Sequence, residues 1–534
     1  MFACSTLSTC ALASSAHAAD CALTESRAAL GALSGARIAS VEIVSESPEL
    51  PGLARALNRL HPASREATIR RQLLFAPGDT VDTLRVGETM RRLRGQRLFS
   101  DVVLKAKRCE GGDLALVMHT RDTWTLRPRI QLRTPSTLSV GVEERNFLGT
   151  GRTFSLSSET SPRGTGAAGR IDDPWLFGTN VAAHVRIASL TGTHSLRAGL
   201  RRHEYSVFDT WQAEANLARL SFGDTAAADR PLHTVAVLLG IGRRIGSDPY
   251  AVTRVSIGGE FDSAASISGT RRSVTSTQSH VRSFVGAELG LSRRTAVFDT
   301  ATWLVPGRGF VDVPMGWEGD AIVAGGKDRA LDVPVVKIDA WFGRVWLPTR
   351  GSILMADAWS SGYLGRLVDA NHIERLSAAW YGAAPGGMWG ARITAERLLE
   401  LDPDLRQLSL MQTADYTAPA VRPFAARAGR SIAGSLERSV RLFPIGARSM
   451  LDAGAFAASS YRWQIAERSE PQLRATVVGG RLRVLSTNGA ISSVRLDVGY
   501  PVALGAGLPR RTFAVLTFGS LFDVARQRDG RRLY

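Results

Sequence analysis

Acidic side chains set into alternating apolar segments are the residues of this chain best suited to chemistry. In "SIAGSLERSVRLF" the apolar face includes Leu436, which leaves Glu437 on the opposite face. In "SMLDAGAF" Leu451 lies on the apolar face and Asp452 lies opposite to it. If both segments are strands, each carboxylate lies on the polar face of a sheet, where it can exchange a proton or pair with an arginine.

The motifs of known catalytic sites do not support an enzyme. "GTGAAG" at 164–169 has the letters of a dinucleotide fingerprint, but no parallel strand and helix flank it and "RIDDPW" follows. The sequence contains no G-x-S-x-G, no H-E-x-x-H and no P-loop, and its nine His lack ligand spacing. We therefore expect no catalytic residue, no cofactor and no metal ion. An inward acid such as Asp497 would be the place to look for hydrolytic chemistry.

The positive charge of the chain has a simpler explanation than nucleic-acid binding. Its formal net charge is +17. Arginines such as Arg186 and Arg495 alternate with apolar residues, as expected for the wall of a polar pore. Other arginines crowd one predicted helix, where they form either a solvated face or a surface that attracts acidic polypeptides or anionic headgroups. These are Arg85, Arg91, Arg92, Arg94 and Arg97.

Alternation of apolar and polar residues dominates the chain from 127 to 522. In "NVAAHVRIAS", Val185 points one way and Arg186 the other, and "WQAEANLA" and "SSVRLDVGYPV" repeat the pattern. Such strands fit a large soluble β-protein or a closed barrel in an outer membrane. Their length favours the barrel, because about 9–11 residues match a tilted membrane crossing. The patterns number 17 or 18 candidate strands.

Residues 37–124 have the pattern of a compact α/β unit in the order strand, helix, helix, strand, strand. The first helix is expected in "SREATIRRQLLF", with Ser64 as its cap, and the second in "DTLRVGETMRRLRGQRLF". Two strands then flank "EGGD", a tight hairpin turn.

The start of the chain predicts export. Residues 1–18 are apolar, rich in small residues and end in "AHA", which indicates a signal peptide, followed by a linker at 19–36. Cys21 and Cys109 remain after cleavage, and an even pair in an oxidising compartment predicts a disulfide, the alternative being two buried thiols. No apolar run approaches the roughly 20 residues of a membrane-spanning helix.

Several segments resemble the outer-membrane insertase superfamily that includes BamA and TamA. "VEERNFLGTGR" (142–152) and "DDPWLFGT" (172–179) resemble its first hairpins, and residues 37–124 resemble a POTRA domain. "VRLDVGYPV" resembles the penultimate strand, and "TFAVLTFGSLF" the closing strand with Gly519 and Phe522. The resemblance implies a mainly β fold: a transmembrane antiparallel barrel of sixteen strands over 127–522, preceded by one POTRA domain. The basic residues 523–534 would form a periplasmic tail, and the closing strand would pair with the first near Ser139 to Glu143.

"TADYTAPAVRPFAARAGRS" (413–431) has neither helical nor strand periodicity and is predicted to be a long connection. It resembles the loop that the superfamily folds into the barrel, whose arginine–glycine–aromatic motif corresponds here to Val421, Arg422, Pro423 and Phe424. Five strand patterns follow it, as in the superfamily, but Pro423 replaces the glycine. "GRGF" at 307–310 matches the letters better and lies earlier in the chain.

The resemblance implies that Arg422 is anchored by the wall acids Glu437 and Asp452. The alternative is that both acids only line a wet lumen.

The resemblance also implies the outer membrane of a diderm bacterium as location, with the POTRA domain in the periplasm. The implied function is assembly of outer-membrane proteins or translocation of polypeptides. Its partners would be unfolded outer-membrane or secreted polypeptides, outer-membrane lipids and accessory periplasmic proteins or lipoproteins, but no nucleic acid. Two alternatives remain: a two-partner secretion transporter for one dedicated substrate, and a passive channel.

Overall fold

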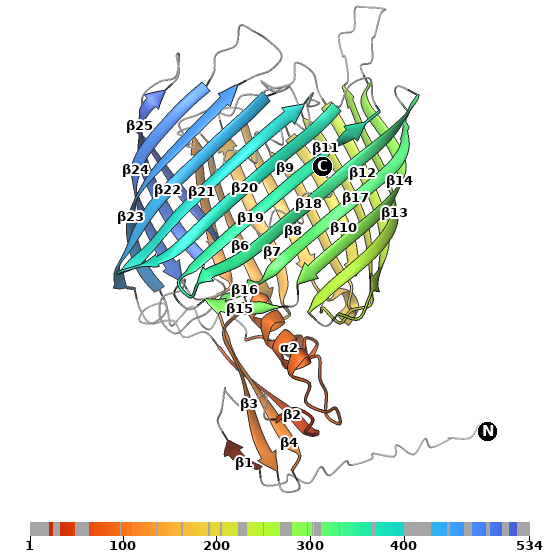
Figure 1. The fold of residues 1–534 in the computed structure, drawn as a ribbon, viewed down its shortest axis with the longest axis vertical. Coiled ribbons are helices and arrows are strands. Elements are labelled where there is room, and N and C mark those ends of the chain that lie inside the picture. Colours follow the sequence, from red (N-terminus) through yellow and green to blue (C-terminus); the bar gives the residue numbers. More distant parts are fainter. Residues whose placement is uncertain are drawn as a thin grey trace, which may run out of the picture.

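The chain folds into a small α/β unit and a large barrel (Figure 1). The computed structural model describes residues 21–24, 33–47, 63–96, 98–109, 112–134, 137–161, 164–190, 193–202, 206–222, 232–248, 250–266, 280–295, 297–301, 303, 311–329, 332–365, 370–399, 429–445, 449–463, 473–486, 492–504 and 512–520.

The α/β unit has the predicted element order, with one additional strand at its start. Its sheet has the order β1-β3-β4-β2, in which β2 runs parallel to β4 and the other pairs are antiparallel. No described helix of the chain is both long and apolar enough to cross a membrane. The elements are β1 (Cys21–Thr24), β2 (Ile38–Glu46), α1 (Glu66–Arg70), α2 (Thr83–Gly95), β3 (Phe99–Cys109) and β4 (Leu114–Asp122).

A continuous apolar core holds this unit together. Ile38, Ile69, Leu93 and Met118 are all 0% exposed and come from both helices and two strands. Asp82 begins α2 by accepting the amide of Leu84 at 2.8 Å, which satisfies one of the unpaired N–H groups of the first turn.

Two local expectations were wrong. Ser64 is not a helix cap: α1 begins without a side-chain cap and has only five residues. The Ser64 hydroxyl instead accepts a hydrogen bond from Asn146 of the barrel at 2.9 Å. Residues 21–24, expected in a linker, form a strand that pairs with 106–109 of β3.

This added strand bears on the predicted disulfide. Cys109 is disulfide-bonded, and Cys21 is its partner in the register between β1 and β3. The side chain of Cys21 lies outside the described ones, so its bond to Cys109 stays a prediction.

The predicted antiparallel barrel is confirmed, but twenty strands close it rather than sixteen. Sequence neighbours pair along the wall, with β14 next to β17, and β26 lies beside β5 where the barrel closes. The strands are β5 (Leu126–Thr134), β6 (Thr137–Phe147), β7 (Arg152–Ser161), β8 (Gly164–Asp173), β9 (Ala182–Leu190), β10 (Thr193–Arg202), β11 (Trp211–Phe222), β12 (Leu232–Ile245), β13 (Ala251–Ser266), β14 (His280–Thr295), β17 (Gly316–Asp328), β18 (Val333–Thr349), β19 (Ser352–Leu364), β20 (Ala370–Ala384), β21 (Gly387–Leu399), β22 (Gly429–Pro444), β23 (Ser449–Trp463), β24 (Leu473–Ser486), β25 (Ser492–Leu504) and β26 (Phe513–Ser520).

The closing contact therefore differs from the expected one. The segment 139–143 belongs to β6, the second strand of the barrel, because β5 precedes it. Gly519 lies in β26, which is the closing strand as predicted, and Phe522 and the tail 523–534 lie outside the described residues.

The outer face of the barrel is apolar, as lipid contact requires. Val185 and Ile187 of β9 are 42% and 58% exposed, whereas Asp497 on the inner face of β25 is 7% exposed, as the alternation predicted. Seven of the large exposed aromatic side chains lie in strand ends and turns at the end of the barrel that meets the α/β unit, as at a membrane interface. They are Phe147, Phe177, Trp211, Tyr250, Trp317, Trp389 and Phe443.

A short hairpin interrupts the barrel wall between β14 and β17. Its strands are β15 (Phe298–Ala301) and β16 (Val311–Pro314), and they form a separate two-stranded sheet. Figure 1 shows this hairpin at the lower end of the barrel, between the barrel strands and α2.

Candidate functional site

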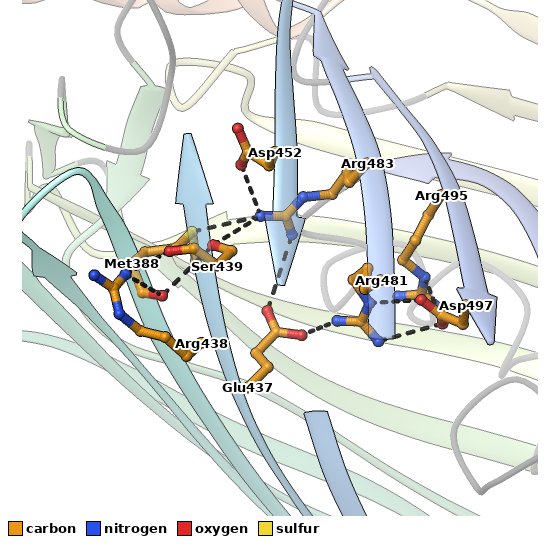
Figure 2. Close-up of polar contacts among 9 residues, drawn as sticks. All are labelled: Met388, Glu437, Arg438, Ser439, Asp452, Arg481, Arg483, Arg495 and Asp497. Carbon is orange, nitrogen blue, oxygen red and sulfur yellow. Dashed lines mark hydrogen bonds and ion pairs between the residues drawn. The ribbon is translucent and has the colours of Figure 1, made fainter. Parts of the chain in front are cut away.

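Six charged side chains on the inner face of four neighbouring strands form what we call the wall cluster (Figure 2). Three acids face three arginines, so their formal charges balance. The members are Glu437 of β22, Asp452 of β23, Arg481 and Arg483 of β24, and Arg495 and Asp497 of β25.

The arginines of β24 occupy the centre of the wall cluster. Arg483 Nη2 donates to Asp452 Oδ2 at 3.1 Å, and the two side chains are 3% and 4% exposed. Arg481 Nε donates to Asp497 Oδ1 at 2.6 Å and also contacts the carboxylate of Glu437. Arg483 additionally lies 3.9 Å from Glu437. The four strands are thus linked by charge as well as by backbone hydrogen bonds.

Alternation in the sequence correctly predicts that Glu437 and Asp452 face inward, but it does not identify their arginine partners. Glu437 and Asp452 face inward, and the outward neighbours Leu436 and Val440 are 50% and 41% exposed. Their arginine partners in the described part of the chain lie on β24. The signal that could have found them is the alternating "RLRV" of β24, which puts Arg481 and Arg483 on one face.

Both candidate arginine motifs, 421–424 and 307–310, lie outside the described residues. The position of the first along the chain agrees with expectation, because five strands, β22 to β26, follow it. Asp452 Oδ1 is buried and accepts no hydrogen bond from any described residue. The wall cluster therefore retains one carboxylate oxygen to which a further donor could bind.

The hairpin at 142–152, which resembles the first hairpin of the insertase superfamily, contacts the α/β unit and attaches it to the barrel. Gly149 is at φ +73°, and its carbonyl accepts the Arg65 amide at 2.9 Å and the Thr68 hydroxyl at 2.9 Å, at the start of α1. A Cβ at Gly149 would stand 2.3 Å from the carbonyl oxygen of Ala63. Only glycine fits this close approach.

A buried acid lies in the same junction. Asp122, at the end of β4, is 1% exposed and accepts the amide of Ser64 at 2.6 Å. Burial raises the pKa of Asp122 to about 6, and the hydrogen bonds from Ser64 offset only part of that rise.

Three arginines of α2 contact a loop of the barrel or the β15–β16 hairpin, but the side chain of Arg85 is still 53% exposed, so the solvated-face reading fits Arg85 better than the more buried Arg92 and Arg94. Arg85 stacks over Phe208 with 5.7 Å between guanidinium carbon and ring centre, and Arg91 over Phe298 at 4.7 Å. Arg94 lies 3.0 Å from Asp312 of β16. Arg92 is 8% exposed and Arg97 lies outside the described residues.

Within the described residues, β1 pairs with only the last four residues of β3. Of the described strands, β1 and β4 pair with β3, and β1 covers only 106–109. Figure 1 shows β1 at the end of the sheet far from the barrel.

Within the described residues, no group of three or more His, Cys, Asp and Glu could hold a metal ion. The acids of the wall cluster are engaged by arginines. These charged side chains can bind a loop or a polypeptide that lies in the polar interior of the barrel.

No protein-family model matches the chain, and no curated protein sequence matches it. CdiB from Escherichia coli is similar in structure, with a TM-score of 0.42, 13% identity and coverage of 93% of this chain and 79% of that one. CdiB from Acinetobacter baumannii has a TM-score of 0.37 and 10% identity, with coverage of 91% and 74%. BamA from Haemophilus ducreyi lacking POTRA domains 1-3 has a TM-score of 0.35 and 10% identity, with coverage of 91% and 85%. At these scores the similarity decides nothing about the activity of this chain.

Proposed function

We propose that the chain is an outer-membrane protein that inserts polypeptides into the membrane or moves them across it. The observation that carries this proposal is an α/β unit, with β1 and β2 at the edges of its described four-stranded sheet, attached to the mouth of a closed barrel. An extended polypeptide can add to an edge of such a sheet through its backbone, which suits clients of varied sequence.

The barrel supplies the second half of the function. Its exposed apolar side chains fit a lipid environment, and the wall cluster makes part of the interior polar. The α/β unit would be a POTRA domain in the periplasm, since it has the strand, helix, helix, strand, strand order of that module and docks at one mouth. A chain held on the sheet of the α/β unit would then lie near the mouth of the barrel (Figure 1).

Reconstitution of the purified chain into liposomes tests this function. If it is an insertase, a urea-unfolded eight-stranded outer-membrane barrel should fold several-fold faster than in empty liposomes. If it is a transporter of the two-partner secretion type, a secreted polypeptide should become protected from external protease. Ion conductance without either effect would leave a passive channel and contradict the proposal.

A further inference from the structure

Three arginines stand directly opposite one another across three neighbouring strands of the barrel. Arg170 of β8 is the register partner of Arg186 of β9, which is in turn the register partner of Arg197 of β10. Register partners lie on the same face of a sheet. Here it is the inner face, because Val185 and Ile187, on either side of Arg186, are exposed on the outer one. We call these three side chains the arginine row. Adjacent strands lie about 4.8 Å apart, so the row is about 10 Å long.

Acidic side chains balance only part of the charge around the arginine row. An ion pair of 2.6 Å joins Arg170 to Asp172 of the same strand. The other arginine on this part of the inner face, Arg201, lies 3.8 Å from Glu214 of β11. Among the described side chains on the inner face of β8 to β11, four arginines therefore stand against these two acids. An acid of β7, Glu159, is opposite the Gly166 position, further along β8. The wall cluster, by contrast, has as many acids as arginines.

The alignment of the arginine row is unfavourable for the barrel alone. Like charges that face each other directly across strands repel and lower the stability of a sheet. A neutral polar side chain is enough to line a wet lumen, as Ser155 of β7 does opposite Arg170. A bound anion would remove the repulsion, because its negative charge would lie among the three guanidinium groups.

The arginine row lies near the barrel mouth to which the α/β unit is attached. Arg170 shortly precedes the end of β8 at Asp173. The turn that follows β8 contains Gly178, at which an added Cβ would lie 3.1 Å from the side chain of Arg71 in the α/β unit. A chain that leaves the α/β unit for the lumen would therefore meet the row close to the entrance.

We propose that the arginine row binds the carboxylates of an acidic segment in a polypeptide client as that segment enters the lumen. The site deepens the proposed function, on which its purpose rests. Guanidinium groups pair with carboxylates through two parallel hydrogen bonds. An extended segment places alternate side chains on one side about 6.7 Å apart, so two acidic side chains of one segment can reach a row of about 10 Å.

Binding of labelled peptides to the purified full-length chain in detergent tests the site. The probe is a short fluorescent peptide of alternating glutamate and serine, and its control has glutamine in place of glutamate. Fluorescence anisotropy should show that the glutamate peptide binds, more weakly as salt is added, and that the glutamine peptide does not. Arg186→Gln and Arg197→Gln should each weaken binding about tenfold, as loss of a charge-assisted hydrogen bond predicts.

Arg202→Gln is the matched control. Arg202 lies on β10, as Arg197 does, but on the outer face, where its guanidinium carbon is 3.6 Å from the ring centre of Trp211. The change should leave peptide binding as it is in the unaltered chain. Unchanged binding in both Arg186→Gln and Arg197→Gln would overturn the site, and so would equal effects of Arg197→Gln and Arg202→Gln.

Urea unfolding, read by the gel shift of the folded barrel, separates binding from a structural role. Arg186→Gln removes repulsion between like charges, so it should raise the urea midpoint of the barrel although it weakens peptide binding. A lower midpoint would identify Arg186 as a structural residue and would contradict the proposal.

Two further outcomes decide what the site binds and whether it serves the proposed function. Displacement of the glutamate peptide by micromolar inorganic phosphate would show a site for phosphate groups and overturn the polypeptide ligand. Peptide binding in detergent requires neither folding nor transport of a client. A chain that binds the peptide at the arginine row but is inactive in liposomes would thus support the site and contradict the proposed function, so the two failures are distinguishable.

Discussion

Arg483 of β24 and Asp452 of β23 stand opposite each other in register and form an ion pair of 3.1 Å that is almost fully buried in the barrel wall. Breaking a buried ion pair lowers the stability of the fold more than breaking an exposed one. Removing one partner of a buried pair leaves an uncompensated charge, whereas exposed pairs contribute little.

Arg483→Ala should therefore lower the free energy of unfolding of the barrel by about 3–5 kcal/mol. The matched control is Arg397→Ala, because Arg397 and Glu374 are also register partners but are 43% and 44% exposed, and its cost should stay below about 1 kcal/mol. Urea titrations read by the gel shift of the folded barrel measure both.

The double variant Arg483→Ala with Asp452→Ala should lose less stability than the sum of the single losses, since the second change removes the stranded carboxylate. Additive losses would show that the two side chains act separately.

Arg422→Ala should also lower the yield of folded barrel, while Arg427→Ala should have little effect. The reason is the unused Oδ1 of Asp452, which can accept a second arginine. Coupling between Arg422→Ala and Asp452→Ala, measured as above, checks the contact. Equal and small effects of Arg422→Ala and Arg427→Ala would identify an ordinary surface loop.

Gly149→Ala should weaken the docking of the α/β unit on the barrel at the start of α1. The new Cβ would meet the Ala63 carbonyl at 2.3 Å, so the hydrogen bond from the Arg65 amide to Gly149 is lost. Hydrogen exchange of the Arg65 amide should rise about tenfold or more, as expected for loss of about 1.4 kcal/mol or more of local stability. Gly164→Ala is the control, because Gly164 also has a positive φ but an added Cβ there has no atom within 4 Å. The backbone strain that Gly164→Ala introduces should not change the hydrogen exchange of the Arg65 amide.

Asp122 should make the junction sensitive to pH. Its pKa of about 6 in the folded chain lies above the ordinary value of 3.8, so the folded state binds the proton more tightly than the unfolded state. The stabilisation by protonation is therefore fully present below about pH 4 and is lost as pH rises through 6, a change of up to about 3 kcal/mol.

Thermal unfolding of the α/β unit, followed from pH 4.5 to 7.5, should show this loss. Asp122→Asn keeps an oxygen for the Ser64 amide and should flatten the difference. A variant with the same pH slope as the unaltered chain would show that another group causes it.

Alternation in the sequence was sufficient to predict which side chains face outward. A residue that meets lipid must be apolar, and its neighbours on the strand must face the other way, so Leu436 and Glu437 are separated by this rule alone. The order of elements in the α/β unit was also readable, because its helices and strands have different periods.

The number of strands was not readable to the same degree. β8 (Gly164–Asp173) and β17 (Gly316–Asp328) are rich in glycine and show weak alternation, yet both pair along their length with their neighbours. Backbone hydrogen bonds hold such strands in the sheet, and these bonds do not require an alternation of apolar and polar side chains.

The arginine partners of Glu437 and Asp452 could not be predicted from the sequence for a different reason. Alternation fixes the face of a strand but not its register, and register decides that Asp452 meets Arg483. The contacts of Gly149 with α1 and of Asp312 with α2 join segments far apart in the sequence. No local pattern in the sequence predicts these contacts.

Crosslinking from the edge of β3 in living cells tests the central claim most directly. A photoreactive residue at Val103 lies on β3 beyond the four residues that pair with β1, and one at Arg108 lies where β1 covers the strand. The proposed function predicts that newly made outer-membrane or secreted polypeptides, pulse-labelled and still unfolded, are captured at Val103 and not at Arg108. Equal capture at both positions, or none at Val103 while such polypeptides are being exported, would contradict it.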